Sequence, residues 1–318
     1  MMKKILLGCM TVLGLLSYEG FAQQQGQYSQ YMMNYFLVNP AVAGTEDYLD
    51  VRMGYRNQWA GLEGAPKNYY LTAHMPLNKI HDRHDKKFHR KMTEPYHVLG
   101  GMASGQTLGA ISTYTANLSY AFHLPLTLKW NMSGGISAGM MQYALNQSKL
   151  EYSNGDPNYD PAQGNYNKIK PNLNVGVWFY TDKFFGGLST SQLFESKQGK
   201  EGKLQRHYYA TAGYRFQLNR ELGLVPSLLF KTVPGAAYQV DVNAKLRYLN
   251  LAWVGLSYRN QDAAVVLLGV NIKDRFEIGY SYDITTSALK AYSAGSHEIM
   301  LALKLETQAQ IHSPSDFW

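Results

Sequence analysis

The chain has 318 residues, of which 45% are hydrophobic and only 17% are charged, and it contains 25 tyrosines, 29 glycines and a single cysteine. This profile fits a β-rich protein with many turns and aromatic belts better than a cytosolic α/β enzyme. The formal net charge is +7, but the basic residues are spread thinly, which argues against nucleic-acid binding.

The first 22 residues have the pattern of a cleavable signal peptide. Lys3 and Lys4 form a basic start, residues 5–16 form a short apolar core, and Gly20-Phe21-Ala22 supplies small residues before a cleavage site at Gln23. We therefore expect an exported protein from which residues 1–22 are removed.

A lipoprotein signal is the alternative, because Leu6-Leu7-Gly8-Cys9 resembles a lipobox. Too few apolar residues precede Cys9 to form the hydrophobic region of such a signal. If Cys9 leaves with the signal peptide, the mature chain has no cysteine for a disulfide or a thiolate metal site.

Residues 23–48 precede the first expected strand and contain an aromatic run followed by Asn39-Pro40-Ala41. An apolar segment without a strand partner must be buried somewhere, so we expect it to be a plug or packing segment inside the structure that follows. A direct contact with a transported substrate stays open as the second interpretation. The aromatic residues are Tyr28, Tyr31, Tyr35 and Phe36.

From residue 49 onward, apolar and polar residues alternate with a period of two, which is typical of β-strands with one apolar and one polar face. In 238–247 the apolar face holds Val240 and Val242, and the other face holds Asp241 and Asn243. A soluble β-sandwich also alternates, so this pattern alone does not indicate a membrane. We expect strands at 49–57, 68–77, 96–103, 113–123, 127–144, 171–181, 184–194, 206–217, 221–232, 237–247, 250–259, 262–272, 274–284 and 296–306.

These strands number about fourteen, an even count, as in bacterial single-chain outer-membrane barrels. No segment after the signal peptide reaches the roughly 20 apolar residues of a membrane-spanning helix, so a membrane-crossing chain must form a closed barrel. Short and long connections alternate as such a barrel requires. The short ones are expected at 123–125, 181–183, 219–220, 248–249 and 273–274, and the long ones at 58–67, 104–112, 145–170, 195–205 and 285–295.

The connection 78–95 breaks this alternation, because it is long and basic where a short turn is expected. A solvated charged loop explains it, and a docking surface for periplasmic proteins is the alternative. The candidate partner-binding residues there are Lys86, Lys87, Arg90 and Lys91.

Arg56 and Trp59 close the first expected strand. Trp59 suits the aromatic girdle at a membrane interface. The planar guanidinium of Arg56 suits a carboxylate, either in the lumen or at a partner's C-terminus. We take both as candidate partner-binding residues.

Two groups of possible metal ligands do not make a convincing site. His81, His84 and His89 match no defined spacing and lie among cationic residues. The loop 154–160 is rich in oxygen ligands but lacks the glutamate that closes an EF-hand. We expect no metal and no cofactor.

Catalysis is also poorly supported. Outer-membrane phospholipid hydrolases place a histidine two residues before the serine of a Ser-Asn-Gly motif, but here Glu151 stands before Ser153. Ser296 and His297 are adjacent in a strand and point to opposite faces. We expect a protein that is not an enzyme.

Several segments resemble the PorP/SprF family of type IX secretion membrane proteins. The most specific is 27–44, which reads QYSQYMMNYFLVNPAVAG, followed by Tyr55-Arg56-Asn57-Gln58-Trp59. The similarity continues in 170–183, 187–189 and 295–300 and covers nearly the whole mature chain. The basic 78–95 connection and the 307–318 tail depart from the family pattern, which puts the identity of the partner in doubt.

The resemblance implies an outer-membrane β-barrel (49–306) that helps to secrete or anchor surface proteins carrying a C-terminal sorting domain, such as gliding adhesins. Its partners would be the secreted adhesin, periplasmic components of the type IX system and outer-membrane lipid. The alternative from the residues is a passive channel for small solutes. The bulky residues on the polar faces, among them Trp178, Lys245, Arg247 and Glu277, argue for a filled lumen.

Overall fold

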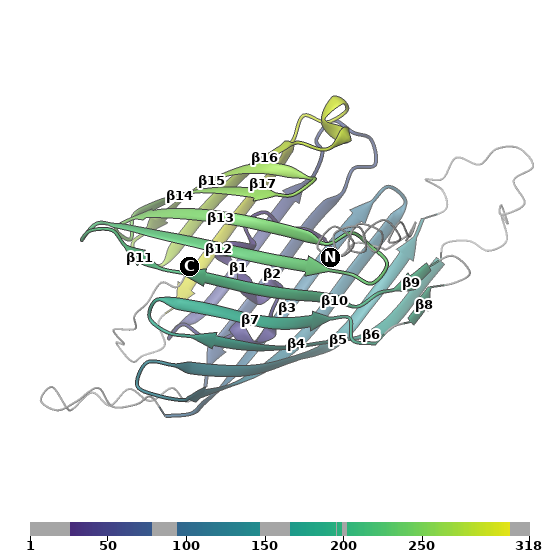
Figure 1. Cartoon of the computed structure of the whole chain (residues 1–318). Helices are drawn as coiled ribbons and strands as arrows, with labels where there is room; N and C mark the ends of the chain where they lie inside the picture. Colours follow the sequence, from purple (N-terminus) through teal and green to yellow (C-terminus); the bar gives the residue numbers. More distant parts are fainter. Residues whose placement is uncertain (1–25, 78–93, 147–165, 195, 199–201, 306–318) are drawn as a thin grey trace, which may run out of the picture.

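The computed structural model describes residues 26–77, 94–146, 166–194, 196–198 and 202–305, and the expected signal peptide and C-terminal tail lie outside them. Fourteen antiparallel strands form a closed barrel, because the first strand pairs with the last (Figure 1). The expected up-and-down barrel is confirmed. Its strands are β1 (Leu49–Asn57), β2 (Lys67–Pro76), β3 (Tyr96–Leu108), β4 (Ile111–Pro125), β5 (Asn131–Leu145), β6 (Tyr166–Tyr180), β7 (Phe184–Ser191), β10 (His207–Tyr214), β12 (Leu222–Thr232), β13 (Gln239–Tyr248), β14 (Ala252–Arg259), β15 (Ala263–Ile272), β16 (Phe276–Thr285) and β17 (Ser296–Leu305).

Polar side chains face the inside of the barrel and apolar side chains face outward. On β13, the inward Asp241 is 1% exposed, whereas its outward neighbour Val242 is 50% exposed. The same division separates Glu298 from Ile299 on β17. A soluble protein has the opposite arrangement, so the outer surface matches the lipid-facing band of a membrane barrel.

Exposed aromatic side chains form a belt near each end of the barrel, on either side of this aliphatic band. Such belts mark the two interfaces of a membrane. One belt contains Tyr55, Tyr69, Tyr114, Tyr208, Tyr238 and Tyr258, and the other contains Trp130, Tyr214, Phe216, Tyr248 and Phe276.

The two ends of the barrel differ in their connections. We call one the loop end, which carries the connections β1–β2, β5–β6, β7–β10 and β16–β17 and lies at the right in Figure 1. We call the other the turn end, which carries the start of β1 and the end of β17. The basic 78–93 segment, which joins β2 to β3 at the turn end, is outside the described residues.

Several expected boundaries are wrong. The connection expected at 104–112 is a two-residue turn, because β3 and β4 remain paired as far as Leu108 and Ile111. The turn expected at 123–125 is still strand, and β5 starts later, at Asn131. The strand expected at 206–217 is interrupted after Tyr214, and the loop expected at 195–205 contains two paired short strands. These additional elements are β8 (Ser196–Gln198), β9 (Gly202–Leu204) and β11 (Phe216–Gln217).

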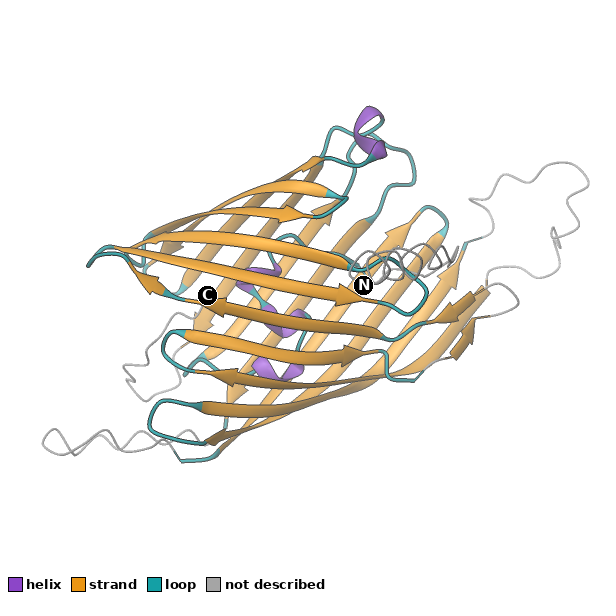
Figure 2. Ribbon diagram, viewed as in Figure 1, coloured by secondary structure: helices purple, strands orange, loops and turns teal. Residues whose placement is uncertain are grey.

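Short 3-10 helices complete the described structure. Three lie in the N-terminal segment and are drawn inside the barrel in Figure 2. A fourth lies in the β16–β17 connection. None of the helices among the described residues is long and apolar enough to cross a membrane. They are η1 (Tyr31–Met33), η2 (Tyr35–Leu37), η3 (Pro40–Val42) and η5 (Ala288–Ala291).

Candidate functional site in the barrel lumen

The N-terminal segment, residues 26–48, runs along the lumen from the loop end to the turn end. Gln27 donates a hydrogen bond to Gln239, at the start of β13, over 2.7 Å. At the other extreme, the backbone oxygens of Ala43 and Gly44 accept hydrogen bonds from side chains near the turn end, and the chain then enters β1. Gln27 therefore lies at the loop end, opposite the turn end at which β2 and β3 are connected.

On one wall, the segment binds a group of buried ionised side chains from β1, β16 and β17. The Glu298 carboxylate accepts hydrogen bonds from the backbone N–H groups of Ser29 and Gln30, at 2.6 and 3.2 Å. The Ser29 hydroxyl donates to Asp283 over 2.7 Å. Arg56 joins both carboxylates, with Nη2 at 2.8 Å from Asp283 and Nη1 at 3.4 Å from Glu298.

Arg56 and the N-terminal segment together compensate the two buried carboxylates of this group. Arg56, Asp283 and Glu298 are each at most 1% exposed, and a buried charge is tolerated only when it is paired and hydrogen-bonded. The N–H groups of Ser29 and Gln30 supply part of that pairing, so the segment is a component of the ionic group.

On the opposite wall, the segment packs against β5, β6 and β7 without charges. The Asn39 side chain accepts a hydrogen bond from the Ala41 N–H, which caps η3, and donates to the Val177 carbonyl over 3.1 Å. Gly135 and Gly176 permit this approach, because a Cβ at either position would overlap Ala41 or Asn39. The Ser133 hydroxyl donates to the Ala41 carbonyl.

Near the turn end, aromatic and histidine side chains hold the end of the segment. His123 Nε2 lies 2.7 Å from the Ala43 carbonyl, and the Tyr96 hydroxyl donates to the Gly44 carbonyl over 2.9 Å. The rings of Tyr96 and His123 stack with centroids 4.5 Å apart. These contacts fix the chain where it turns into β1.

Glu46, Asp50 and His74 bring three possible metal-ligand atoms within 4.8 Å of one another. Both oxygens of Asp50 already accept hydrogen bonds from Arg52, and His74 Nδ1 accepts one from Gly44. A guanidinium beside the group opposes a bound cation. Burial, reinforced by the Asp50 carboxylate, raises the pKa of Glu46 to about 7. The group is therefore poorly suited to holding a metal ion.

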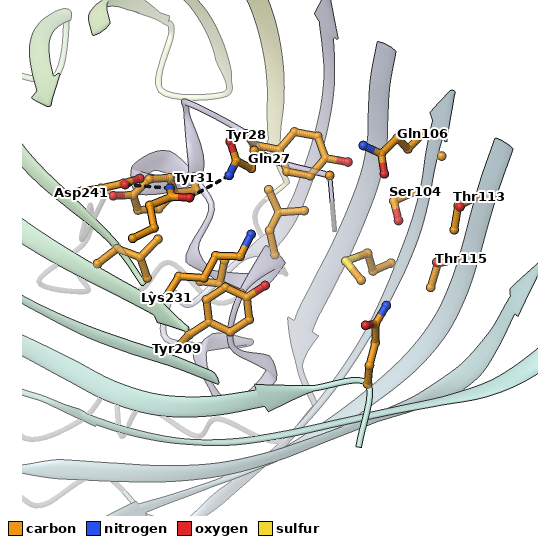
Figure 3. A pocket seen from close by; sticks show the side chains of 18 of the residues that line it. Gln27, Tyr28, Tyr31, Ser104, Gln106, Thr113, Thr115, Tyr209, Lys231 and Asp241 are labelled. Atoms are coloured by element: carbon orange, nitrogen blue, oxygen red, sulfur yellow. Dashed lines mark hydrogen bonds between the residues drawn. The ribbon is translucent and has the colours of Figure 1, made fainter. Parts of the chain in front are cut away.

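A cavity of about 100 Å³ lies between the N-terminal segment and the barrel wall, toward the loop end (Figure 3). One side is formed by β3 and β4, with Ser104, Gln106 and Thr115, and the other by β10, β12, β13 and β14. Arg259 is bound there by the carboxylates of Asp241, Asp262 and Asp283 at 3.3, 3.1 and 3.8 Å. The other residues of that side are Tyr209, Leu229, Lys231 and Gln239.

The candidate partner-binding residues from the sequence are separated in the structure. Arg56 is buried in the lumen and bound to carboxylates of the chain itself, the first of the two possibilities considered for it. Trp59 lies in the β1–β2 connection at the loop end, where its backbone N–H donates to the Ser296 hydroxyl over 3.0 Å. Lys86, Lys87, Arg90 and Lys91 lie outside the described residues, as do His81, His84, His89 and the 154–160 loop.

The period-two alternation places Asp283 and Glu298 on the polar faces of their strands, but it does not pair them with Arg56 or with the N-terminal segment. Their inward positions could have indicated this pairing, because an ionised residue that faces the interior of a barrel needs a partner. Ser296 and His297 lie on opposite faces as expected, with the Ser296 hydroxyl bound to Trp59 N–H and His297 Nδ1 at 2.7 Å from the Tyr280 hydroxyl. They form no catalytic pair.

Comparisons with solved structures return outer-membrane barrels. The CymD monoaromatic hydrocarbon channel matches with 11% identity and a TM-score of 0.48, covering 91% of this chain and 96% of that one. The Pseudomonas putida toluene transporter TodX matches with 9% identity and a TM-score of 0.49, covering 92% and 97%. The Acinetobacter baumannii outer membrane protein Omp33 matches with 8% identity and a TM-score of 0.47, covering 83% and 100%.

No curated protein matches the sequence. A family model does: the model of the type IX secretion system membrane protein PorP/SprF matches residues 20–303. This match covers the N-terminal segment and nearly the whole barrel, and it confirms the resemblance found in the sequence. The chain is an outer-membrane β-barrel that belongs to the PorP/SprF family of type IX secretion system membrane proteins.

Proposed function

We propose that the protein is a non-enzymatic component of the type IX secretion system that helps to secrete or anchor surface proteins carrying a C-terminal sorting domain, such as gliding adhesins. In this proposal the N-terminal segment is a plug. The protein then works through its loop end, which faces the cell exterior, and does not pass cargo through its own lumen.

The observation that carries the proposal is the way the N-terminal segment fills the lumen. It contacts the charged wall through Ser29 and Gln30 and the uncharged wall through Asn39 and Ala41. A folded domain or an extended polypeptide cannot pass while both sets of contacts persist. The family match supports the assignment to secretion.

The loop end offers the accessible surface for cargo. The β16–β17 connection carries η5, in which no residue is buried, and its Ala294 and Gly295 exchange backbone hydrogen bonds with Ala60 of the β1–β2 connection. Trp59 precedes Ala60, so our candidate partner-binding tryptophan belongs to this paired surface. The basic turn-end segment containing Lys86, Lys87, Arg90 and Lys91 is our candidate for contacts with periplasmic components of the system.

A pull-down with a purified sorting domain tests the loop-end role. The bait is offered to the full protein and to a variant in which residues 287–293 are replaced by a short Gly-Ser linker. We expect recovery of the variant to fall at least tenfold, whereas a variant with three substitutions in the turn-end connection 126–130 should be recovered as well as the wild type. Equal recovery of all three proteins would contradict the proposal.

The passive channel is the alternative, and conductance separates the two functions. In planar bilayers we expect the wild-type protein to stay closed and a variant lacking residues 26–44 to pass a steady ion current. A steady current through the wild-type protein would favour the channel and reject the plug.

A further inference from the structure

The cavity near the loop end contains a lysine that makes no direct ion pair or hydrogen bond with the described residues. Lys231, on β12, is only 8% exposed and lines the cavity, and no hydrogen bond or ion pair to its ammonium occurs within the described ranges. Figure 3 shows its side chain extending into the open space beside Tyr209. An ammonium in this position is unfavourable unless a ligand or solvent in the cavity compensates it.

The arginines of the lumen are paired with carboxylates, in contrast to Lys231, and the buried Lys245 instead donates to Met33 Sδ over 3.3 Å. Arg52, Arg56 and Arg259 each bind at least one carboxylate within 3.1 Å. Asp241, the anion in the cavity wall, is engaged by Arg259 and by the Gln239 amide. Because Arg259 is already bound by three carboxylates, Lys231 is the charged residue of the described lining that makes no ion pair, and a ligand carboxylate beside it would form one.

A second polar atom of the cavity lining also lacks a partner. The buried Gln192 Oε1 accepts no hydrogen bond from the described residues, although Gln192 lines the cavity. The Gln192 backbone lies in the left-handed region at φ 58°, and its N–H donates a hydrogen bond to the Asn174 side chain over 3.0 Å. These features fix the backbone from which the side chain extends. A turn of this amide toward the cavity would let the oxygen accept a hydrogen bond from an N–H group of the ligand.

The remaining surface of the cavity is partly apolar. Leu37 and Val38 of the N-terminal segment and Met102, Met141 and Leu229 of the barrel line it. Methionine side chains adapt to apolar groups of different shape. The ligand that matches all three features has a carboxylate, a nearby N–H group and an apolar side chain.

We propose that the cavity binds the C-terminal residue of a polypeptide. Lys231 pairs with the terminal carboxylate, Gln192 accepts the amide N–H, and the side chain packs on Met102 and Met141. The choice of a polypeptide rests on the proposed function in secretion, whereas the carboxylate rests on Lys231 itself. A cargo chain would enter from the loop end, because Gln106 and Thr113 of the lining adjoin the β3–β4 turn there.

The test uses the full-length protein in detergent micelles and a fluorescein-labelled Gly-Gly-Gly-Leu peptide, as the free acid and as the C-terminal amide. We expect fluorescence anisotropy to give a Kd at least tenfold lower for the acid than for the amide. Lys231→Gln should abolish this difference and Lys231→Arg should keep part of it. The matched control Lys129→Gln, which removes an exposed charge at the turn end, should leave it unchanged.

The comparison of acid and amide in the wild type needs no variant, so it stands even if Lys231→Gln fails to fold. Equal binding of acid and amide, or no binding of either, would overturn the proposal. Decanoate that competes as well as the peptide acid would also overturn it, because the site would then take a lipid-like anion. The pull-down above reports on the β16–β17 connection, which the short peptides do not need. Loss of recovery on loop shortening, together with equal binding of acid and amide, would reject the cavity site and leave the proposed function standing.

Discussion

The two walls of the lumen hold the same N-terminal segment by different physical means. The wall formed by β1, β16 and β17 uses ionised side chains, with Arg56 between Asp283 and Glu298. The wall formed by β5, β6 and β7 uses hydroxyl and amide groups, and glycines at Gly135 and Gly176 permit close contact. Charge thus fixes one side of the segment and shape fixes the other.

The charged wall lies where the barrel closes. Arg56 and Glu298 face each other across the pairing of β1 with β17, the first and last strands of the barrel. Their ion pair forms only when the ends of the barrel chain meet, and the N–H groups of Ser29 and Gln30 complete it. We infer that barrel closure and docking of the segment are energetically coupled on this wall and independent of each other on the uncharged wall.

The largest expected effect comes from breaking the charged wall with Arg56→Met. The substitution leaves Asp283 and Glu298 buried with less compensation, and removing one partner of a buried ion pair typically costs about 3–5 kcal/mol. We expect a lower urea midpoint, monitored by tryptophan fluorescence in micelles, and a measurable ion current as the segment loosens.

The double variant Arg56→Met/Glu298→Gln is the control for this prediction. Because it also removes one of the two unpaired carboxylate charges, it should recover part of the lost stability. Together with the single variant Glu298→Gln, it gives the coupling energy between the two side chains. Unchanged stability and conductance in Arg56→Met would show that the ion pair does not hold the segment.

The next effect concerns Glu46, where the segment reaches the charged side at the turn end. Burial and Asp50 raise the pKa of its carboxyl from 4.5 to about 7. The folded state thus binds this proton more tightly than the unfolded state, and stability falls as pH rises through the interval between these two values. Glu46→Gln removes the ionisation, so its advantage over the wild type should grow between pH 5 and pH 8, to about 1–3 kcal/mol.

Urea unfolding at both pH values measures this advantage, with Glu63→Gln in the exposed β1–β2 connection as the control. An advantage of Glu46→Gln that is the same at pH 5 and pH 8 would contradict the raised pKa. If the stability of Glu46→Gln relative to the wild type instead decreases from pH 5 to pH 8, the folded state needs the ionised carboxylate.

Much of the barrel can be predicted from the sequence, because the face to which each side chain points depends only on its position within its own strand. Alternation in 238–247 assigns Asp241 to the lumen and Val242 to lipid, since a strand has a period of two. The β3–β4 turn was missed because glycines near 105 and 109 resemble loop residues. Gly105 is instead the place where the Tyr69 ring covers the strand, and a Cβ there would overlap that ring. Without the strand register, the sequence does not show whether a glycine lies in a loop or is covered by a side chain from the neighbouring strand.

The lumen contacts were less predictable because they join residues that are distant in the sequence. Arg56 was recognised as a carboxylate-binding residue, but its partners follow 227 and 242 residues later and meet it only through the closed register. Lys231 and Gln192 gave no signal at all. They stand out only in the folded barrel, where the described residues give no hydrogen-bond partner to the Lys231 ammonium or to Gln192 Oε1.

A single added methyl group should disrupt the packing on the uncharged wall. Gly135→Ala places a Cβ against the backbone of Pro40 and Ala41, so η3 must shift, and we expect a loss of about 1–3 kcal/mol. Gly134→Ala is the matched control on the adjacent, outward-facing position, where a Cβ meets nothing within 4 Å. If both variants unfold at the same urea concentration, close packing of η3 does not contribute to stability.

The smallest expected effect separates the two roles of Asn39 on the same wall. Asn39→Ala removes the cap on η3 and the hydrogen bond to Val177, which should cost about 1–2 kcal/mol. Asn39→Ser keeps a side chain that caps helices well but is too short to reproduce the amide contact with the wall. An unfolding midpoint for Asn39→Ser between those of the wild type and Asn39→Ala would assign part of the loss to each role. If Asn39→Ser instead matches the wild type, the wall hydrogen bond contributes nothing, and the uncharged wall holds the segment by its shape alone.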